Sequence, residues 1–259
     1  MPFTLIGFYE NVDPAAAFNA LTALADQHIT VSGDDVRVPT LNQVVAVAVG
    51  AENAVAPLAR LVSPSLRRRT NLYLAPLNVA AAASVEPGSP QRVIDLRRRP
   101  IQLVTGENLN VEVNSNPVAA QDQWGLVWLA DGPIAPVEGA MFTIRATATT
   151  DLTANVWSNV AITFQEDLPR GRYQCVGLRG ESASMIACRL VFPEGGWRPG
   201  VLGCDAVDDI QHEMFRYGGL GVFGEFEDTT PPTVDALADL ADVDSEYYLD
   251  LIQLREGPA

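Results

Sequence analysis

Lysine is absent from all 259 residues, so the 17 basic side chains are all arginines. A nucleotide-binding P-loop needs a lysine ammonium on the phosphates, and a protein kinase needs a strand lysine for the same purpose. A Schiff base with pyridoxal phosphate or a carbonyl substrate needs an amine that can lose its proton, which guanidinium cannot do at usable pH. These classes of enzyme are therefore excluded.

Histidine and cysteine are scarce. One of the two histidines, His212, follows Asp208 by four residues and would share a helix face with it, an arrangement that can chelate a cation. An acidic helix start with a histidine near its end is also ordinary charge matching to the helix dipole, and we favour that interpretation. Cys175, Cys188 and Cys204 form no C-x-x-C pair and are too few for a disulfide scaffold, which favours buried free thiols. We expect no metal, no cofactor and no catalytic residue.

Long apolar runs are also missing. The longest, Val44–Val49 and Val79–Val85, are far shorter than the roughly 18–20 residues that span a bilayer. The first residues, MPFTLIGFYENVDP, have no basic region before the apolar segment and reach an acid at Glu10, unlike a secretory signal. We therefore expect no transmembrane segment and no export.

The charge balance is strongly acidic. The 32 acidic side chains give a formal net charge of −15, which repels nucleic-acid phosphates, so strong direct nucleic-acid binding is not expected. Guanidinium groups bind both carboxylates and phosphates, and the abundance of acids favours contacts with a neighbouring subunit over contacts with a genome. Positive charge is concentrated in two triplets, in SPSLRRRT and DLRRRP, which are candidate subunit-interface or phosphate contacts: Arg67, Arg68, Arg69, Arg97, Arg98 and Arg99.

The first hundred residues mix several patterns. DPAAAFNALTALADQH begins with a capping Asp-Pro pair and places Phe18, Leu21 and Leu24 on one face, which predicts a short amphipathic helix. In ITVSGDDVRVP, alternating apolar residues flank Gly33 and two aspartates, which predicts a tight hairpin. Residues 84–91, SVEPGSPQ, concentrate Pro, Gly and Ser and predict a linker or a long surface loop.

Strand patterns dominate from residue 101 to the acidic C-terminal tail. PIQLVTGENLNVEVNSN, QWGLVWLADGP, MFTIRATATT and NVWSNVAITF are apolar and β-branched runs that end in turn-forming residues. RGRYQCVGLRGESASMIACRLVFP predicts a long hairpin with Cys175 nearly opposite Cys188. We expect a mixed β/α region or a first sandwich over residues 1–100 and a jelly-roll β-sandwich over residues 101–259. The predicted fold class is mainly β: an antiparallel jelly roll or β-sandwich, one sandwich or two, with a few short helices.

Two conspicuous motifs have structural explanations. Gly219, Gly221 and Gly224 match the letters of the dinucleotide motif G-x-G-x-x-G, but EFEDTTPP cannot begin the helix that this motif needs, so close packing of a loop or strand is favoured. Trp124 and Trp128 are an even number of residues apart on a strand and lie in the apolar run WGLVWL, so we expect them in the core.

The succession MFTIRATATT, NVWSNVAITF, RGRYQCVGLRGESASMIACRLVFP and GVFGEFE resembles the strand series of viral jelly-roll coat proteins, particularly those of tailless icosahedral phages. The resemblance covers about residues 101–227 and lies in strand rhythm and loop style. It implies a subunit that forms trimers or pentamers in a shell with copies of itself and with other capsid proteins, located in the virion after synthesis in the host cytoplasm. The chain departs from many plant- and animal-virus coats by lacking a basic N-terminal arm.

The sequence thus favours a self-assembling structural protein without catalytic activity. A 47% hydrophobic content supports assembly, because soluble monomers rarely expose large apolar patches. One alternative is a lectin-like sandwich that binds carbohydrate through tryptophans, for which the candidates are Trp124, Trp128, Trp157 and Trp197. Another is a glycosidase, which needs two convergent carboxylates; the acids on or beside the predicted strands are Glu107, Glu112, Glu166, Asp167, Glu225 and Glu227.

Overall fold

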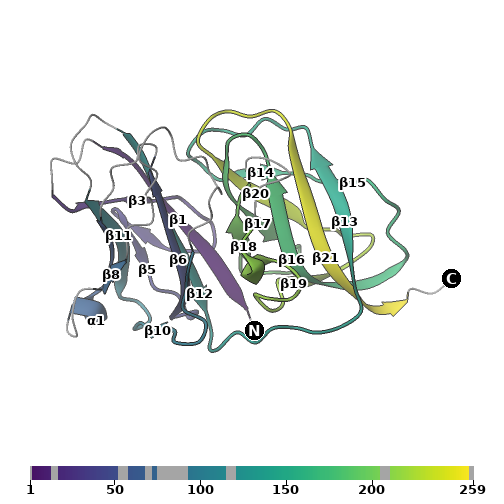
Figure 1. Cartoon of the computed structure of the whole chain (residues 1–259), viewed down its shortest axis with the longest axis horizontal. Coiled ribbons are helices and arrows are strands. Elements are labelled where there is room, and N and C mark those ends of the chain that lie inside the picture. The colour runs from purple at the N-terminus through teal and green to yellow at the C-terminus, as the bar shows by residue number, and fades with distance from the viewer. Residues whose placement is uncertain are drawn as a thin grey trace. The chain divides into compact units, whose positions relative to one another are not determined.

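The computed structural model describes residues 2–12, 17–51, 58–67, 72–74, 93–114, 121–204 and 211–256. They form two compact units. The N-terminal roll contains the described residues between 5 and 133, and the C-terminal roll contains those between 134 and 256 together with residues 2–4. Each unit consists of two sheets of antiparallel strands (Figure 1). The expectation of a mainly β fold is therefore confirmed, with two sandwiches rather than one.

The C-terminal roll is a jelly roll. Its main strands are those described in this unit, numbered in chain order, without the two-residue strand Thr163–Phe164. One sheet joins the first, eighth, third and sixth main strands, and the other joins the second, seventh, fourth and fifth. This order arises when four antiparallel strand pairs, 1-8, 2-7, 3-6 and 4-5, are wrapped into two layers as two Greek keys. The first sheet, with β15 at its edge, contains β15 (Thr163–Phe164), β13 (Met141–Ala148), β21 (Ser245–Glu256), β16 (Gly171–Glu181) and β19 (Gly224–Glu227). The second contains β14 (Ser158–Val160), β20 (Thr233–Ala238), β17 (Met185–Val191) and β18 (Gly200–Leu202).

The N-terminal roll repeats this strand order. Its first sheet contains β10 (Ile101–Gln102), β6 (Gln43–Ala51), β12 (Gln121–Ala130) and β1 (Phe3–Val12), with β3 (Thr22–Ala23) beside β1 and β9 (Ile94–Asp95) beside β6. Its second sheet contains β5 (Asp35–Arg37), β11 (Asn108–Asn114), β7 (Leu58–Val62) and β8 (Leu72–Leu74), with β4 (Val31–Ser32) beside β5 and β2 (Asn19–Ala20) beside β11. A one-turn helix, α1 (Pro64–Arg67), follows β7. Both units are therefore jelly rolls.

Apolar side chains fill the space between the two sheets of each roll. In the C-terminal roll, Leu249 and Leu251 occupy alternate positions of β21 and are fully buried, as is Leu190 of β17. In the N-terminal roll, β12 and β11 approach so closely that a Cβ at Gly125 would lie 2.9 Å from the Cβ of Val111. Each interior is thus a packed core, in agreement with the alternating pattern of the strands.

Two local predictions in the N-terminal roll have opposite outcomes. The hairpin is confirmed: β4 and β5 pair across a turn in which Gly33 has φ 67°, a conformation that glycine adopts without steric cost. The helix through Leu21 is wrong, because its described part forms β2 and β3. The backbone N–H of Leu21 donates to the carbonyl of Val111 at 3.0 Å, so pairing with a distant strand overrides the helical spacing. Residues 84–91 lie outside the described residues.

The long hairpin predicted around Cys175 and Cys188 is also wrong, although both of its strands exist. β16 pairs with β21 and β19, whereas β17 pairs with β20 and β18 in the other sheet. In a jelly roll the third and fourth strands belong to opposite layers. The short connection between β16 and β17 therefore crosses from one sheet to the other.

The division between the units also differs from the expected boundary at residue 100. β10, β11 and β12 follow that boundary but pair with β6, β7 and β5 of the N-terminal roll. The last strands of a jelly roll return beside its earlier ones, so residues 101–130 complete the first roll. The change between units lies between residues 133 and 134.

Candidate functional site

The second arginine triplet forms an exposed turn between β9 and β10 of the N-terminal roll. Asp95 fixes this turn, because its carboxylate accepts a hydrogen bond from the backbone N–H of Arg97 at 3.0 Å and pairs with Nη2 of the same residue at 2.7 Å. The backbone N–H of Arg99 donates to the carbonyl of Leu96 at 2.8 Å and closes the turn. Arg98 and Arg99 are exposed, so their guanidinium groups are available to an external carboxylate or phosphate.

The first arginine triplet is described only at its start. The backbone of Arg67 ends α1. Its side chain, together with Arg68 and Arg69, lies outside the described residues. A role for this triplet therefore stays a prediction.

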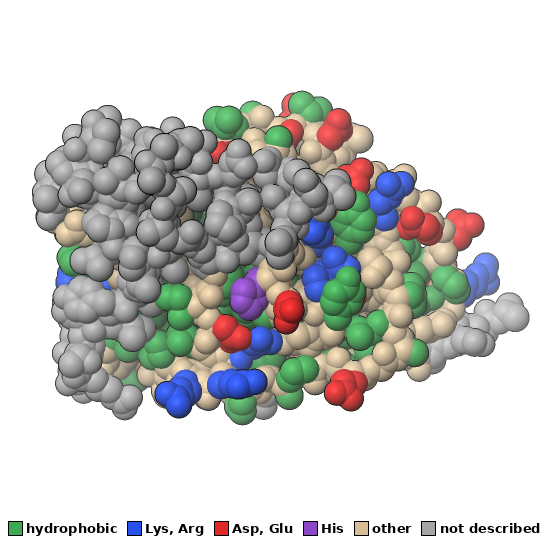
Figure 2. Space-filling model, viewed as in Figure 1, with side chains coloured by type: hydrophobic (Ala, Val, Ile, Leu, Met, Phe, Trp, Pro, Cys, Tyr) green, Lys and Arg blue, Asp and Glu red, His purple; other side chains and the backbone are tan. Residues whose placement is uncertain are grey.

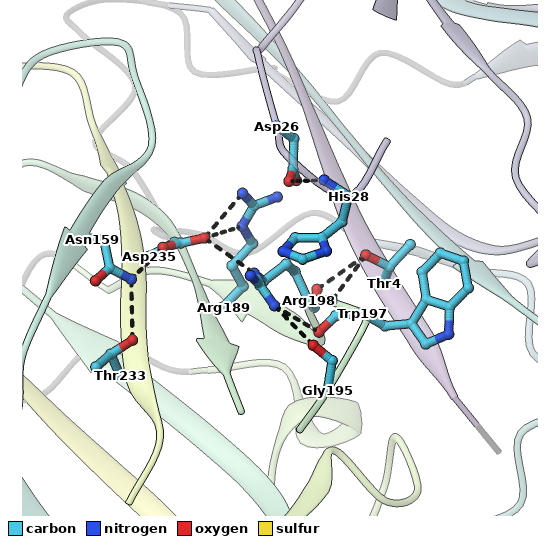
Figure 3. Close-up of polar contacts among 10 residues, drawn as sticks. All are labelled: Thr4, Asp26, His28, Asn159, Arg189, Gly195, Trp197, Arg198, Thr233 and Asp235. Atoms are coloured by element: carbon cyan, nitrogen blue, oxygen red, sulfur yellow. Dashed lines mark hydrogen bonds and ion pairs between the residues drawn. The ribbon is translucent and has the colours of Figure 1, made fainter. Parts of the chain in front are cut away.

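A charged cluster lies across three strands of the second sheet of the C-terminal roll (Figure 3). Asn159, Asp235 and Arg189 are directly opposite one another on β14, β20 and β17. Asp235 accepts a hydrogen bond from the amide of Asn159 at 2.7 Å, its Oδ2 lies 3.1 Å from Nη2 of Arg189, and Nε of Arg198 lies 3.7 Å away. The Arg189 side chain is 2% exposed, and its guanidinium carbon lies 4.0 Å from the ring centroid of Trp157. These contacts tie strands and loops together through charge-assisted and cation–π interactions.

A second buried carboxylate anchors the loop that precedes β19. Asp250 of β21 is fully buried and accepts hydrogen bonds from Nε and Nη2 of Arg216 at 2.6 and 2.7 Å. It also accepts one from Oγ1 of Thr143 at 2.7 Å and one from the backbone N–H of Tyr217 at 2.9 Å. Burial alone would lower the pKa of Arg216, but the hydrogen bonds and charge of Asp250 raise that pKa above its ordinary value. Arg216 follows the 3₁₀ turn η1 (Glu213–Phe215), so the anchor holds this loop against the first sheet.

A pocket of about 170 Å³ lies at the edge strand β19 of the C-terminal roll. Polar side chains and two apolar ones line it: Arg172, Pro193, Glu194, Glu225, Phe226, Glu227 and Thr230. Nη2 of Arg172 lies 2.8 Å from Oε2 of Glu225, and both side chains are exposed. Glu225 and Glu227 are thus two candidate glycosidase acids that the structure brings to one place.

Other candidate glycosidase acids make structural contacts. Glu107 accepts hydrogen bonds from the backbone and the hydroxyl of Ser65 at the start of α1. Partial burial would raise the pKa of Glu107, but these and neighbouring hydrogen bonds lower it below its ordinary value. Glu112 accepts from Nε of Arg60 at 2.6 Å, and Glu166 accepts a backbone N–H of β13 at 2.9 Å. Because its lowered pKa keeps it ionised, Glu107 is a poor general acid.

Within the described ranges, no group of three or more His, Cys, Asp or Glu side chains is arranged to hold a metal ion. Nδ1 of His212 accepts the backbone N–H of Met214 at 3.2 Å and caps η1, whereas Asp208 lies outside the described residues. In that same part of the chain, no helix has the length and apolar character to cross a membrane. Acidic, basic and apolar side chains are interspersed on the face drawn in Figure 2.

The chain matches no known protein-family model and no curated protein sequence. One solved structure that matches it is the major capsid protein P2 from bacteriophage PM2, at 12% sequence identity, over 97% of each chain and with a TM-score of 0.27. A TM-score this low does not establish a shared fold. The jelly-roll assignment of both units rests on their own strand order.

Three interpretations of the sequence are confirmed. The cysteines are free and buried, and burial raises the pKa of Cys175 to about 12. Trp124 and Trp128 are core residues, with exposed fractions of 4% and 0%. Close packing explains Gly224, where a Cβ would lie 2.6 Å from the ring of Phe192.

Two buried aspartates, Asp235 and Asp250, were not among the residues predicted from the sequence. Each is the one acid inside an apolar strand segment, in TVDALA and in YLDLIQL. A lone charge at such a place needs a partner when buried. That pattern is the signal that could have identified them, although the arginine partners are distant in the sequence.

Proposed function

We propose that the protein is a self-assembling structural subunit of a viral capsid, without catalytic activity. The observation that carries this proposal is the presence of two jelly rolls in one chain, each with a packed core. Jelly rolls form viral capsid domains, and also lectins and cupins. Because a packed interior leaves little room for a ligand, the function of this chain falls to its surfaces.

The exposed surface supports contacts between copies. Large apolar side chains with exposed fractions between 36% and 64% occur in both rolls: Val104, Met141, Phe142, Val156, Tyr217, Leu240, Val243 and Leu254. Such side chains lose contact with water where copies of the chain meet. Copies of this chain, as trimers or pentamers in a shell with other capsid proteins, are the proposed partners, and the virion is the proposed location. The two arginine triplets then contact carboxylates of neighbouring copies.

The mass of the purified protein in solution tests this proposal. Mass photometry and light scattering over a range of protein concentrations should detect trimers, pentamers or larger shells, and electron microscopy should show their shape. A 27.8 kDa monomer at every concentration would contradict self-assembly.

The pocket at β19 favours one alternative, a carbohydrate-binding protein. Its carboxylates, Arg172 and Thr230 can hydrogen-bond to sugar hydroxyls beside the Phe226 ring. A glycan array would identify such binding, and Glu225→Gln should then weaken it. If the protein instead releases reducing sugar from a glycan, and Glu225→Gln abolishes this release, the protein is a glycosidase.

A further inference from the structure

Hydrogen bonds join three loops of the C-terminal roll into one surface. The backbone N–H of Leu152 donates to the carbonyl of Asp242 at 2.7 Å, and that of Asp239 donates to the carbonyl of Ser184 at 3.0 Å. These bonds link the β13–β14, β16–β17 and β20–β21 connections. We call this surface the aspartate tip and define it as residues 149–157, 182–184 and 239–244. These bonds hold the backbones of the three loops next to one another, so their exposed side chains belong to one surface.

The aspartate tip combines exposed aliphatic side chains with charge of one sign. Val156, Leu240 and Val243 have exposed fractions of 45%, 64% and 58%. The loops that form the tip contain aspartates but no arginine or histidine. Two of the aspartates, Asp151 and Asp244, are exposed and have no hydrogen-bond or ion-pair partner among the described residues. The tip is thus an apolar patch beside unpaired negative charge.

The N-terminal roll carries a surface of the opposite sign. Within the described part of the chain, the guanidinium groups of Arg98 and Arg99 have no partner. The carboxylate of Asp95 forms its ion pair with Arg97. Val104 follows on the same edge of the sheet, just beyond β10, and is 61% exposed. We call Arg98, Arg99 and Val104 the arginine edge.

We infer that the aspartate tip of one copy binds the arginine edge of a neighbouring copy. This inference rests on the proposed self-assembly and identifies the surfaces that would carry it. Two unpaired carboxylates meet two unpaired guanidinium groups, and aliphatic side chains on both surfaces lose contact with water. Matching charges of opposite sign also fix the orientation of the two copies and disfavour contacts between identical surfaces.

The proposed contact joins two different surfaces, so it can form about a two-fold axis, with the tip of each copy on the edge of the other, or along a series of copies. In a series the contact is heterologous, because every copy offers its tip to one neighbour and its edge to another. Repetition of such a contact produces a ring where the rotation closes and an extended array where it does not. A closed ring, such as a trimer or a pentamer, provides the repeated contacts that a shell needs.

Charge reversal tests the contact in the full-length protein. The first double variant carries Arg98→Glu and Arg99→Glu, and the second carries Asp151→Arg and Asp244→Arg. A third variant carries all four changes. Mass photometry across protein concentrations would compare the association of each variant with that of the wild type. Like charges brought together cost several kcal/mol, so each double variant should raise the dissociation constant about a hundredfold or more. The four-change variant should return to within about tenfold of the wild type, because both surfaces are reversed together. The four side chains are exposed and unpartnered among the described residues, so folding, checked by circular dichroism, should be retained.

A matched control reverses two exposed aspartates outside the tip, with Asp131→Arg and Asp167→Arg. This control changes the net charge as much as the tip variant does and should leave association unchanged. If the double variants associate like the wild type, or if the control weakens association equally, the inference fails while the proposed function stands. A wild type that remains monomeric overturns both.

Discussion

Replacing Asp250 by alanine should destabilise the C-terminal roll by about 3–5 kcal/mol, the usual effect of removing one partner of a buried ion pair. The carboxylate is fully buried and accepts four hydrogen bonds, two of them from Arg216. Without it, a guanidinium whose side chain is 14% exposed has no counter-charge, and the backbone N–H of Tyr217 loses its acceptor. Since domains are stable by about 5–15 kcal/mol, this loss is a large part of the total.

Hydrogen exchange measured by mass spectrometry at increasing urea concentrations would report the opening free energy of each roll separately. Peptides that cover residues 211–223 and 245–256 should lose protection in Asp250→Ala. Glu225→Ala is the matched control, because it removes a carboxylate from an exposed ion pair with Arg172, which contributes only about 0–1 kcal/mol. A loss below about 1 kcal/mol in Asp250→Ala, or one equal to the control, would refute the reasoning.

A double-mutant cycle separates the charge interaction from the loss of packing. Asp250→Leu and Arg216→Met each leave one buried charge unpaired, whereas the double variant leaves none. We expect the double variant to be more stable than the sum of the single losses predicts, by about 2–3 kcal/mol. Additive losses would show that the pair contributes no coupling.

Two further predictions concern other parts of the C-terminal roll. Burial raises the pKa of Cys175 from 9.0 to about 12, so between these pH values the unfolded chain loses a proton that the folded chain keeps. The free energy of unfolding in urea should therefore fall by about 1.4 kcal/mol per pH unit from this thiol, and an unchanged slope in Cys175→Ala would contradict this. Gly218→Ala should cost more than about 1 kcal/mol in the same assay, because Gly218 has φ 79° and a Cβ there would lie 2.1 Å from the carbonyl oxygen of Val137. Gly196→Ala, with no atom within 4 Å of its Cβ, should change stability by less than about 0.5 kcal/mol, and equal effects of the two substitutions would be the contrary result.

Features decided by neighbouring residues could be predicted from the sequence. The turn at Gly33 depends on a local backbone conformation that glycine adopts readily. The burial of Trp124 and Trp128 depends on their even spacing in an apolar strand. The strands after residue 101 were visible for the same reason, since alternation and turn residues are properties of short segments.

Pairing could not be predicted, because it is decided by residues far apart in the chain. Cys175 and Cys188 lie on two real strands, but each strand finds its partners in a segment that comes later in the sequence. The boundary at residue 100 failed for a similar reason: β10 to β12 look like the start of a new run of strands, yet they complete the first roll. Asp235 and Asp250 were missed because their arginine partners are recognisable only in three dimensions.

The repeated strand order allows the regions around the sixth main strand of the two rolls to be compared. The sixth main strand of the N-terminal roll is β10, and the turn that precedes it carries Arg97, Arg98 and Arg99. The sixth strand of the C-terminal roll is β19, which carries Glu225 and Glu227. The fold does not require this difference, because the strand order is the same in both rolls.

Opposite charges on surfaces of the two rolls favour contacts between unlike surfaces. A two-fold axis that passes through the arginine edge would place this edge against its own copy, and like charges would repel. A contact between unlike rolls of neighbouring copies brings opposite charges together instead. Surfaces of opposite charge on the two rolls therefore disfavour a two-fold axis through either surface and agree with the pairing of the aspartate tip with the arginine edge.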